Sequence, residues 1–313
     1  MFDQFGRNID YLRLSVTDQC NLSCLYCQPG ESAPCRRLSC DEMILAVREM
    51  ARLGIRKVRV TGGEPLTRQD LEALITGISA ISGIEEIPMT TNGIGLAERL
   101  PGLLDAKLTR INFSLDTLKP DRYRRITGQD ALDSVWKGIR AALSAGIHVK
   151  VNAVLIGGIN DDEIDDFIAL ARENPLEFRF IELMPIGRYG ELHQKQIIRG
   201  DDILSSRPYL KPAGTGAGGV ARLYSGPGFK GKVGLISPVS HAFCSDCNRV
   251  RLTCDGRLKM CLGNNGEADL MPALRGDPRQ LGRLIRDTIY HKPRGHQFQE
   301  SFTSARSMRQ IGG

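Results

Sequence analysis

The 313-residue sequence contains no apolar run close to the roughly 20 residues that a helix needs to cross a lipid bilayer. Residues 1–10 also lack the charged and then apolar pattern that is typical of a secretory signal. We therefore expect no membrane segment, and we place the protein in the cytoplasm.

Aromatic side chains are scarce, at 6% of the sequence, and the formal net charge is only +6. Surfaces that bind single-stranded nucleic acid interleave stacked aromatic side chains with basic ones, so the composition argues against such a surface. The small positive charge instead suits a compact polyanionic ligand. A generally basic, solvated surface is the alternative explanation of the same net charge.

Nine cysteines are present, and most of them lie in two short clusters. In a reducing compartment such clusters bind metal more often than they form disulfides. The first cluster has the spacing C-x3-C-x2-C and consists of Cys20, Cys24 and Cys27. Three thiolates this close cannot share one face of a regular helix, so they predict a loop folded around a ligand. Three cysteines can hold three irons of a cubane and leave the fourth iron open to a cofactor; structural zinc is the alternative.

The second cluster begins with Cys244 and Cys247 in a C-x2-C pattern, and Cys261 follows after thirteen intervening residues. This spacing is compatible with a second three-cysteine iron–sulfur cluster. It is equally compatible with a closed zinc site, in which Cys254 or His241 would supply the fourth ligand.

A short strand is predicted directly after Cys247, and it places Arg249, Arg251 and Thr253 on one face. Two guanidinium groups beside a cysteine cluster favour a phosphate or carboxylate ligand, because arginine binds oxyanions through two parallel hydrogen bonds. A solvated edge strand is the alternative.

Strand and helix patterns alternate along the first part of the chain. Strands are predicted at 11–17, 56–61, 84–90, 110–116, 147–155 and 177–184, and helices at 38–53, 70–81, 120–126, 131–145 and 161–172. Six strands that alternate with helices in this way predict a parallel sheet.

Five of these strands have one apolar and one polar face, whereas an open doubly wound sheet needs two apolar faces. A curled sheet resolves the conflict, because its apolar faces meet outer helices and its polar faces line an interior that holds a ligand. The sequence therefore predicts an α/β fold, an incomplete (β/α)6 barrel with its active site at the carboxyl ends of the strands. An open Rossmann-like sheet is the alternative.

The sequence changes character after Pro185, and we expect a partial barrel at 1–185 and a C-terminal region at 186–313. In the second region, the glycine-rich residues 213–219 predict a loop or linker. Short strands are predicted within 209–234, and residues 277–291 predict a helix.

The first cysteine cluster, with an aromatic residue just before its last cysteine, resembles the signature of the radical S-adenosylmethionine (SAM) enzymes. The chain also contains GGEP at 62–65, TTNG at 90–93, ELMPIG at 182–187, FCSDCNRVRLT at 243–253 and a terminal Gly-Gly. This combination closely resembles the GTP 3′,8-cyclase family of molybdenum cofactor biosynthesis, over essentially the whole chain. That family commonly lacks cysteine at positions 35, 40 and 254, so we interpret Cys35, Cys40 and Cys254 as bystanders. It commonly has Met in place of Gln28, from which we expect no change of reaction.

The resemblance implies two [4Fe–4S] clusters and SAM as cofactors. The implied cluster ligands are Cys20, Cys24 and Cys27 for the first cluster, and Cys244, Cys247 and Cys261 for the second. The groups expected around SAM are Tyr26, Gly63, Glu64, Ser114 and Met184. Among these, Tyr26 is expected to border the adenine, and Glu64 to accept a hydrogen bond from the SAM ammonium.

The GTP-binding residues that the resemblance implies are Arg13, Arg59, Thr90, Lys150, Arg249 and Arg251. The strand pattern supports this set, because Arg13, Arg59 and Lys150 each lie on the polar face of a predicted barrel strand. Buried cations without partners are costly, so they predict an anion in the interior, such as a triphosphate. Pairing with internal acids such as Asp116 and Glu182 is the alternative.

The implied reaction joins C3′ of the GTP ribose to C8 of guanine, as the first step of molybdenum cofactor biosynthesis. Arg13 is a candidate catalytic residue for the last step of that reaction. The family also implies that the tail, Gly312 and Gly313, reaches the active site, where glycine lets backbone pass close to ligands. The partners that the family implies are an electron donor such as flavodoxin or ferredoxin, the cyclic pyranopterin monophosphate synthase that takes the product, and a second copy in a homodimer.

Two other functions remain in competition. A radical SAM enzyme that modifies peptides would share the first cluster, but gives no reason to place Arg249 and Arg251 beside the second. A zinc-stabilised RNA-binding protein would explain the charge and the cysteines. GTP-dependent cleavage of SAM tests the first alternative, and iron and sulfide analysis tests the second.

Overall fold

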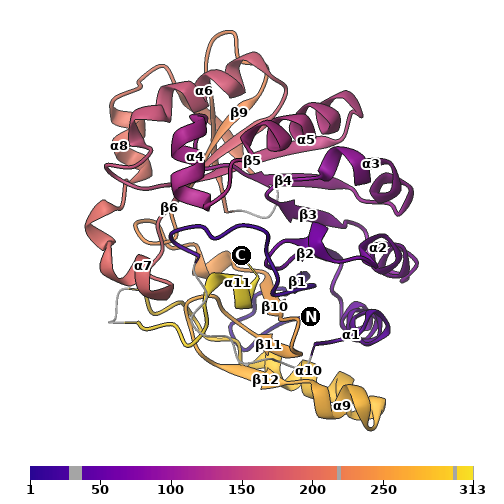
Figure 1. Cartoon of the computed structure of the whole chain (residues 1–313). Helices are drawn as coiled ribbons and strands as arrows, with labels where there is room; N and C mark the ends of the chain where they lie inside the picture. The colour runs from indigo at the N-terminus through magenta and orange to yellow at the C-terminus, as the bar shows by residue number, and fades with distance from the viewer. Residues whose placement is uncertain (28–36, 217–219, 299–301, 313) are drawn as a thin grey trace.

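The computed structural model describes residues 1–27, 37–216, 220–298 and 302–312. In this part of the chain, the strands form one sheet in the order β12-β11-β10-β1-β2-β3-β4-β5-β6-β9-β8-β7. Figure 1 shows this sheet curling, with helices on its outer side and the C-terminal helix α11 on its inner side. No helix within the described ranges is both long and apolar enough to cross a membrane.

The six predicted strands are confirmed as a run of parallel neighbours, from β1 to β6. Their bounds are β1 Tyr11–Ser15, β2 Lys57–Thr61, β3 Pro88–Thr91, β4 Arg110–Ser114, β5 His148–Leu155 and β6 Glu177–Glu182. The main helices between them are α1 Cys40–Arg52, α2 Leu71–Ser79, α3 Leu96–Asp105, α4 Pro120–Thr127, α5 Leu132–Ser144 and α6 Ile164–Glu173.

Helix α3 is absent from the prediction. Pro101 and Gly102 lie in its middle and argue locally against a helix. The helix nevertheless forms, because Leu96, Leu100 and Leu103 bury one apolar face against the core. Tertiary packing thus outweighs the local propensity at this position.

The C-terminal region adds a parallel strand to each side of the predicted six. Strand β9 (Lys232–Ile236) pairs with β6, and β10 (Arg249–Leu252) pairs with β1. Antiparallel strands then extend both edges: β8 (Arg222–Ser225) and β7 (Lys211–Thr215) beyond β9, and β11 (Arg257–Lys259) and β12 (Glu267–Asp269) beyond β10. One sheet therefore runs through both halves of the chain.

The prediction of a loop at 213–219 is wrong for residues 213–215, which belong to β7. That strand forms through backbone pairing with β8, which needs no apolar side-chain pattern and so leaves no periodic signal in the sequence. Residues 217–219 lie outside the described residues.

The remaining helices follow β6 in the chain. They are α7 Gly187–Leu192, α8 Gly200–Ser205, α9 Met271–Arg275, α10 Pro278–Tyr290 and α11 Met308–Ile311, with short 3₁₀ turns at Pro65–Thr67 (η1), Asp161–Glu163 (η2), Gln194–Gln196 (η3) and Cys244–Asp246 (η4). Helix α10 confirms the prediction for residues 277–291, and it packs against α1.

The two faces of the sheet differ as the alternation predicts. Leu12, Leu14, Val58 and Val60 are fully buried in the main core together with residues of the outer helices. The alternating positions of the same strands carry polar side chains toward the inner side, where α11 lies (Figure 1). The curled sheet therefore encloses a polar interior, and this interior contains the candidate site.

Candidate active site

The first cysteine loop leaves the carboxyl end of β1. Its cysteines, Cys20, Cys24 and Cys27, are partly buried and form no disulfide. Burial raises the pKa of Cys24, and the nearby Asp116 and the two other cysteines raise it further. Burial and the charge of Cys20 raise the pKa of Cys27 to about 12. Because thiolates are the metal-binding form, three mutually repelling thiolates in this loop need a cationic ligand, and the donor set fits an iron–sulfur cluster.

The GGEP turn after β2 fixes the start of this loop. The Gly63 N–H donates to the Thr17 carbonyl at 2.7 Å, and the Glu64 N–H donates to the Gln19 carbonyl at 2.7 Å. A Cβ atom on Gly63 would lie 2.1 Å from the Gln19 oxygen. Only glycine allows this approach, so Gly63 determines where the loop that carries Cys20 begins.

The Glu64 carboxylate links the GGEP turn to the TTNG segment at the end of β3. It accepts hydrogen bonds from the Thr91 hydroxyl at 2.7 Å, the Asn92 N–H at 2.6 Å and the Leu66 N–H at 3.0 Å. Burial raises the pKa of Glu64 to about 7, although these hydrogen bonds oppose the rise. Its expected contact with the SAM ammonium stays a prediction, and its role in the described structure is to join two turns.

Tyr26 connects the same loop to the ends of β4 and β5. Its hydroxyl donates to the Asp116 carboxylate at 2.6 Å, and that carboxylate also accepts from the Val154 N–H at 2.8 Å. Ser114 ends β4, two residues before Asp116. Tyr26 and Ser114 thus belong to one region at the carboxyl ends of the strands, which suits two residues expected around the same cofactor.

Met184 follows the carboxyl end of β6. It packs against a small apolar cluster of Ile186, Phe298 and Ile311, of which Ile311 belongs to the C-terminal helix α11. The structure therefore places Met184 beside the tail, and its expected contact with SAM stays a prediction.

Basic side chains gather in the interior around the phenol of Tyr11. Arg59 donates to the Tyr11 hydroxyl and, at 3.2 Å, to the hydroxyl of Thr90. The guanidinium of Arg249 lies 5.5 Å from the centre of the Tyr11 ring. Burial alone would raise the pKa of Tyr11, but the charges of Arg59, Arg13, Arg249 and Lys57 outweigh it and lower the pKa to about 8. The interior therefore carries a strong positive potential.

Arg13 lies within the same basic group. Burial lowers the pKa of its guanidinium, and the neighbouring charge of Arg251 lowers it further. Burial also lowers the pKa of Arg251, to about 10. These lowered pKa values express the cost of placing several cations together away from water.

Lys150 and Arg179 share one internal acid, Glu177. The Lys150 ammonium lies 2.6 Å from the Glu177 carboxylate, which also pairs with the Arg179 guanidinium. The acids that the sequence suggested for this purpose are occupied elsewhere: Asp116 binds Tyr26, and Glu182 accepts from Val239 and Ser240. Pairing with internal acids was the alternative to a bound anion. The structure shows such a pair for Lys150, and it is formed with Glu177 and not with Asp116 or Glu182.

The second cysteine set lies at the opposite end of the strands from the first. Cys247 precedes β10, whereas Cys20 follows β1, and these two strands are parallel neighbours. Cys261 follows β11, which is antiparallel to β10, so it returns to the same end as Cys247. The basic interior therefore lies between the two cysteine sets, and β10 places Arg249 and Arg251 next to the second.

Neither proposed fourth zinc ligand joins the second set. Cys254 is buried in the main apolar core, and His241 binds Asp201 at 2.6 Å. Among the residues that the structure describes, no three His, Cys, Asp or Glu side chains converge on the position of one metal ion. Cysteine ligands of a cubane each bind a different iron, and the three partly buried cysteines fit that group.

The C-terminal tail enters this interior. Helix α11 ends at Ile311, which is buried, and the carbonyl of Gly312 accepts a hydrogen bond from Arg251. A Cβ atom on Gly312 would lie 2.9 Å from the Ser15 Cβ and 3.1 Å from the Thr61 Cγ2, and the backbone there has a φ of +83°. Gly312 therefore fits against Ser15 of β1 and Thr61 of β2 because it has no side chain. Gly313 lies outside the described residues.

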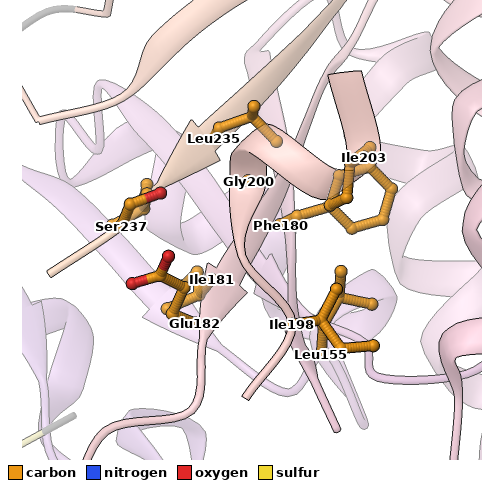
Figure 2. Close-up of a pocket in the computed structure, with 10 residues that line it drawn as sticks. Leu155, Phe180, Ile181, Glu182, Ile198, Gly200, Ile203, Leu235 and Ser237 are labelled. Carbon is orange, nitrogen blue, oxygen red and sulfur yellow. The ribbon is translucent and has the colours of Figure 1, made fainter. Parts of the chain in front are cut away.

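A separate small cavity lies between β6, β9 and α8, and Figure 2 shows Leu155, Phe180, Ile203 and Leu235 among its lining residues. The space within it, open solvent included, is about 170 Å³, below the roughly 300 Å³ of small-molecule pockets. Its walls are mainly apolar, so it does not suit a nucleotide.

Sequence reasoning missed three residues of the basic interior, namely Tyr11, Glu177 and Arg179. Tyr11 lies two residues before Arg13 on the same face of β1, and Glu177 and Arg179 lie opposite Lys150 and Asn152 in the register of β6 with β5. The inward face of each strand therefore contained the signal, and extending the pattern to both strand ends would have found them.

Replacing Glu177 with Gln leaves Lys150 and Arg179 buried without their carboxylate, which we expect to lower the free energy of unfolding by about 3–5 kcal/mol. Although burial favours the neutral acid, Arg179 and Lys150 lower the pKa of Glu177. The stabilisation is therefore complete at neutral pH and is lost as the pH falls below the ordinary carboxylate range. Thermal or denaturant unfolding at pH 7 and at acidic pH measures it.

The matched control is Glu85→Gln, which removes an exposed carboxylate and should change stability little. Inorganic triphosphate should recover part of the loss in Glu177→Gln by supplying the missing negative charge. Equal stability of the parent and Glu177→Gln at pH 7 would contradict the assigned ion pairs.

Two family models together match most of the chain. The model described as Radical SAM superfamily matches residues 14–171, and the model described as Molybdenum Cofactor Synthesis C matches residues 176–298. Among curated relatives, the GTP 3′,8-cyclase of Alkaliphilus metalliredigens (strain QYMF) is 45% identical over 320 residues, and that of Moorella thermoacetica is 44% identical over 326 residues. Both alignments cover 100% of this chain and 100% of the relative.

Solved structures support the fold. The crystal structure of SuiB from Streptococcus suis bound to S-adenosylmethionine matches with a TM-score of 0.64, over 91% of this chain and 67% of that chain. The sequence identity in that comparison is 15%, so it supports the architecture alone.

Proposed function

This chain belongs to the GTP 3′,8-cyclase family within the radical SAM superfamily, and we propose that it converts GTP to (8S)-3′,8-cyclo-7,8-dihydroguanosine 5′-triphosphate, the first step of molybdenum cofactor biosynthesis. One observation supports this most directly. A strongly basic interior lies between the two sets of three cysteines, and Glu177 is the carboxylate that pairs with its Lys150 and Arg179. A nucleoside triphosphate supplies both the negative charge and the length that this arrangement requires.

The cofactors are SAM and two [4Fe–4S] clusters, one for each three-cysteine set. When bound, SAM and the first cluster supply the radical chemistry that removes a hydrogen atom from C3′ of the ribose. Cys20, Cys24 and Cys27 would hold the first cluster, and Cys244, Cys247 and Cys261 the second.

The triphosphate is bound by basic side chains from several strands. Arg59, Thr90 and Lys150 were expected from the sequence, and we add Arg179 because it shares Glu177 with Lys150. Neutralisation by one carboxylate leaves a net positive charge on this group, which favours a phosphate over a neutral ligand. Arg249 and Arg251 lie at the end of the interior where the second cluster binds.

The chain also limits access of water to the reacting atoms. Helix α11 packs its buried Ile311 against Ile186 and Phe298, and Gly312 follows against Ser15 of β1 and Thr61 of β2. This plug excludes water from the interior, which protects a reactive carbon centre from side reactions.

Arg13 is proposed as the residue that supplies a proton in the final step. A guanidinium is ordinarily too weak an acid for this role. Burial and the charge of Arg251 lower its pKa, and both effects make the proton easier to release. Arg13→Lys should still form 5′-deoxyadenosine in the presence of GTP but yield less cyclised product. Equal loss of both would argue for a role in binding, and loss of neither would contradict the proposal.

The decisive experiment is anaerobic incubation of the reconstituted, dithionite-reduced protein with SAM and GTP, followed by mass analysis. We expect 5′-deoxyadenosine that depends on GTP, together with a product that retains the mass of GTP but has lost the free rotation between base and ribose. Formation of 5′-deoxyadenosine without GTP would remove GTP as the substrate and reopen a peptide-modifying function. Zinc in place of iron would contradict the whole assignment.

The position of the C-terminal tail predicts that turnover is sensitive to changes at the end of the chain. Adding one residue after Gly313, or replacing Gly312 with Ala, should lower turnover several-fold, because Gly312 has contacts that leave no room for a Cβ atom. Iron content and the absorption of both clusters should stay unchanged. The control is a variant with one residue added before Met1, at the other terminus. Full turnover of the variant with one added C-terminal residue would refute a role for the tail.

The cellular setting is part of the proposal. Clustered free thiols favour a reducing compartment, and we place the protein in the cytoplasm. We further propose flavodoxin or ferredoxin as electron donor, direct transfer of product to the cyclic pyranopterin monophosphate synthase, and a homodimer, which light scattering tests. Residues 1–185 and 186–313 are proposed as two functional units, one for each cluster, although they share a sheet.

A further inference from the structure

A buried lysine lies beside the second cysteine set. Lys292 follows helix α10, and only 2% of the residue is exposed. Its ammonium donates to the carbonyl of Met260, the residue that precedes Cys261. Within the described ranges, no carboxylate forms an ion pair with this ammonium.

Such a charge needs a negative partner, because an isolated buried ammonium is strongly destabilising. The thiols of the second set are the groups placed to provide it. Cys261 directly follows Met260, whose carbonyl accepts the hydrogen bond from Lys292. Cys244 lies near the same segment, because Arg7 donates to the carbonyls of both Cys244 and Lys292.

The backbone that carries Lys292 is fixed from the opposite end of the chain by Arg7. The Arg7 guanidinium forms an ion pair of 2.6 Å with Asp3, whose side chain is fully buried. The remaining N–H groups of this guanidinium donate to backbone carbonyls, namely those of Cys244 at 2.8 Å, Pro293 at 2.7 Å, Arg294 at 3.0 Å and Lys292 at 3.4 Å. One side chain thus joins the backbone of the Cys244 loop to the backbone segment that carries Lys292.

We propose that Lys292 is the buried counter-charge of the second cluster and raises its reduction potential. A fixed positive charge favours the more negative, reduced form of a cluster, and net charge and exposure are among the factors that set cluster potentials. Solvent does not screen this charge because the ammonium is buried. Lys292 is a positioning residue in this sense: it acts on the cluster and does not contact GTP.

The test is a redox titration of the full chain with both clusters reconstituted, monitored by electron paramagnetic resonance without SAM or GTP. A parallel protein with Cys20→Ser, Cys24→Ser and Cys27→Ser identifies the signal of the second cluster. We expect Lys292→Gln to shift the midpoint potential of the second cluster to a more negative value, and Lys292→Arg to keep it near that of the parent. The potential of the first cluster serves as the internal reference and should not move.

Arg294→Gln is the matched control, because it removes one positive charge from an exposed residue two positions away and should shift the potential less. An unchanged potential in Lys292→Gln overturns the proposal. If Lys292→Gln loses iron, recovery of the cluster in Lys292→Arg supports a need for the charge, and loss in both variants overturns it. The inference rests on the second cluster of the proposed function but not on GTP, so a failure to cyclise GTP leaves this measurement interpretable.

Discussion

Positive charge held away from water is the constraint on which the rest of this structure depends. Alternation along the strands brings Arg59, Lys150 and Arg179 into the interior of a curled sheet, and Glu177 neutralises only part of their charge. The Tyr11 phenol, whose pKa falls to about 8 among these cations, shows how strong the local potential is. A polyanionic substrate completes the interior, because its binding replaces repulsion with ion pairs.

The sheet order converts this interior into a site with two ends. Because β10 inserts beside β1 in parallel, the residues after β1 and the residues before β10 emerge at opposite ends of the strands. The first cysteine set follows β1, and the second set surrounds the start of β10. A substrate in the interior can therefore meet one set at each end, and Gly312 of the C-terminal tail lies against Ser15 and Thr61 at the carboxyl ends of β1 and β2.

Hydrogen bonds of the turns position the site more than the apolar core does. The GGEP turn binds the chain before Cys20, Glu64 joins that turn to TTNG, and Tyr26 joins the cysteine loop to Asp116. At the other end, Arg7 gathers the carbonyls around Cys244 and Lys292. These contacts join segments that are far apart in the chain.

The sequence was enough to predict the six parallel strands, the polar inner face and both cysteine sets, because these follow from short-range periodicity and spacing. It did not reveal helix α3, the continuation of a strand through residues 213–215, or the pairing of Glu177 with Lys150 and Arg179, because packing and cross-strand register produce them. It also left undecided whether the second cysteine set binds zinc or an iron–sulfur cluster, since spacing does not say where a side chain points. In the folded chain, Cys254 is buried in the apolar core and His241 binds Asp201. Lys292 and Arg7, from opposite ends of the chain, both lie beside the second cysteine set. Contacts between residues almost 300 positions apart arise from the sheet order, which no local pattern in the sequence contains.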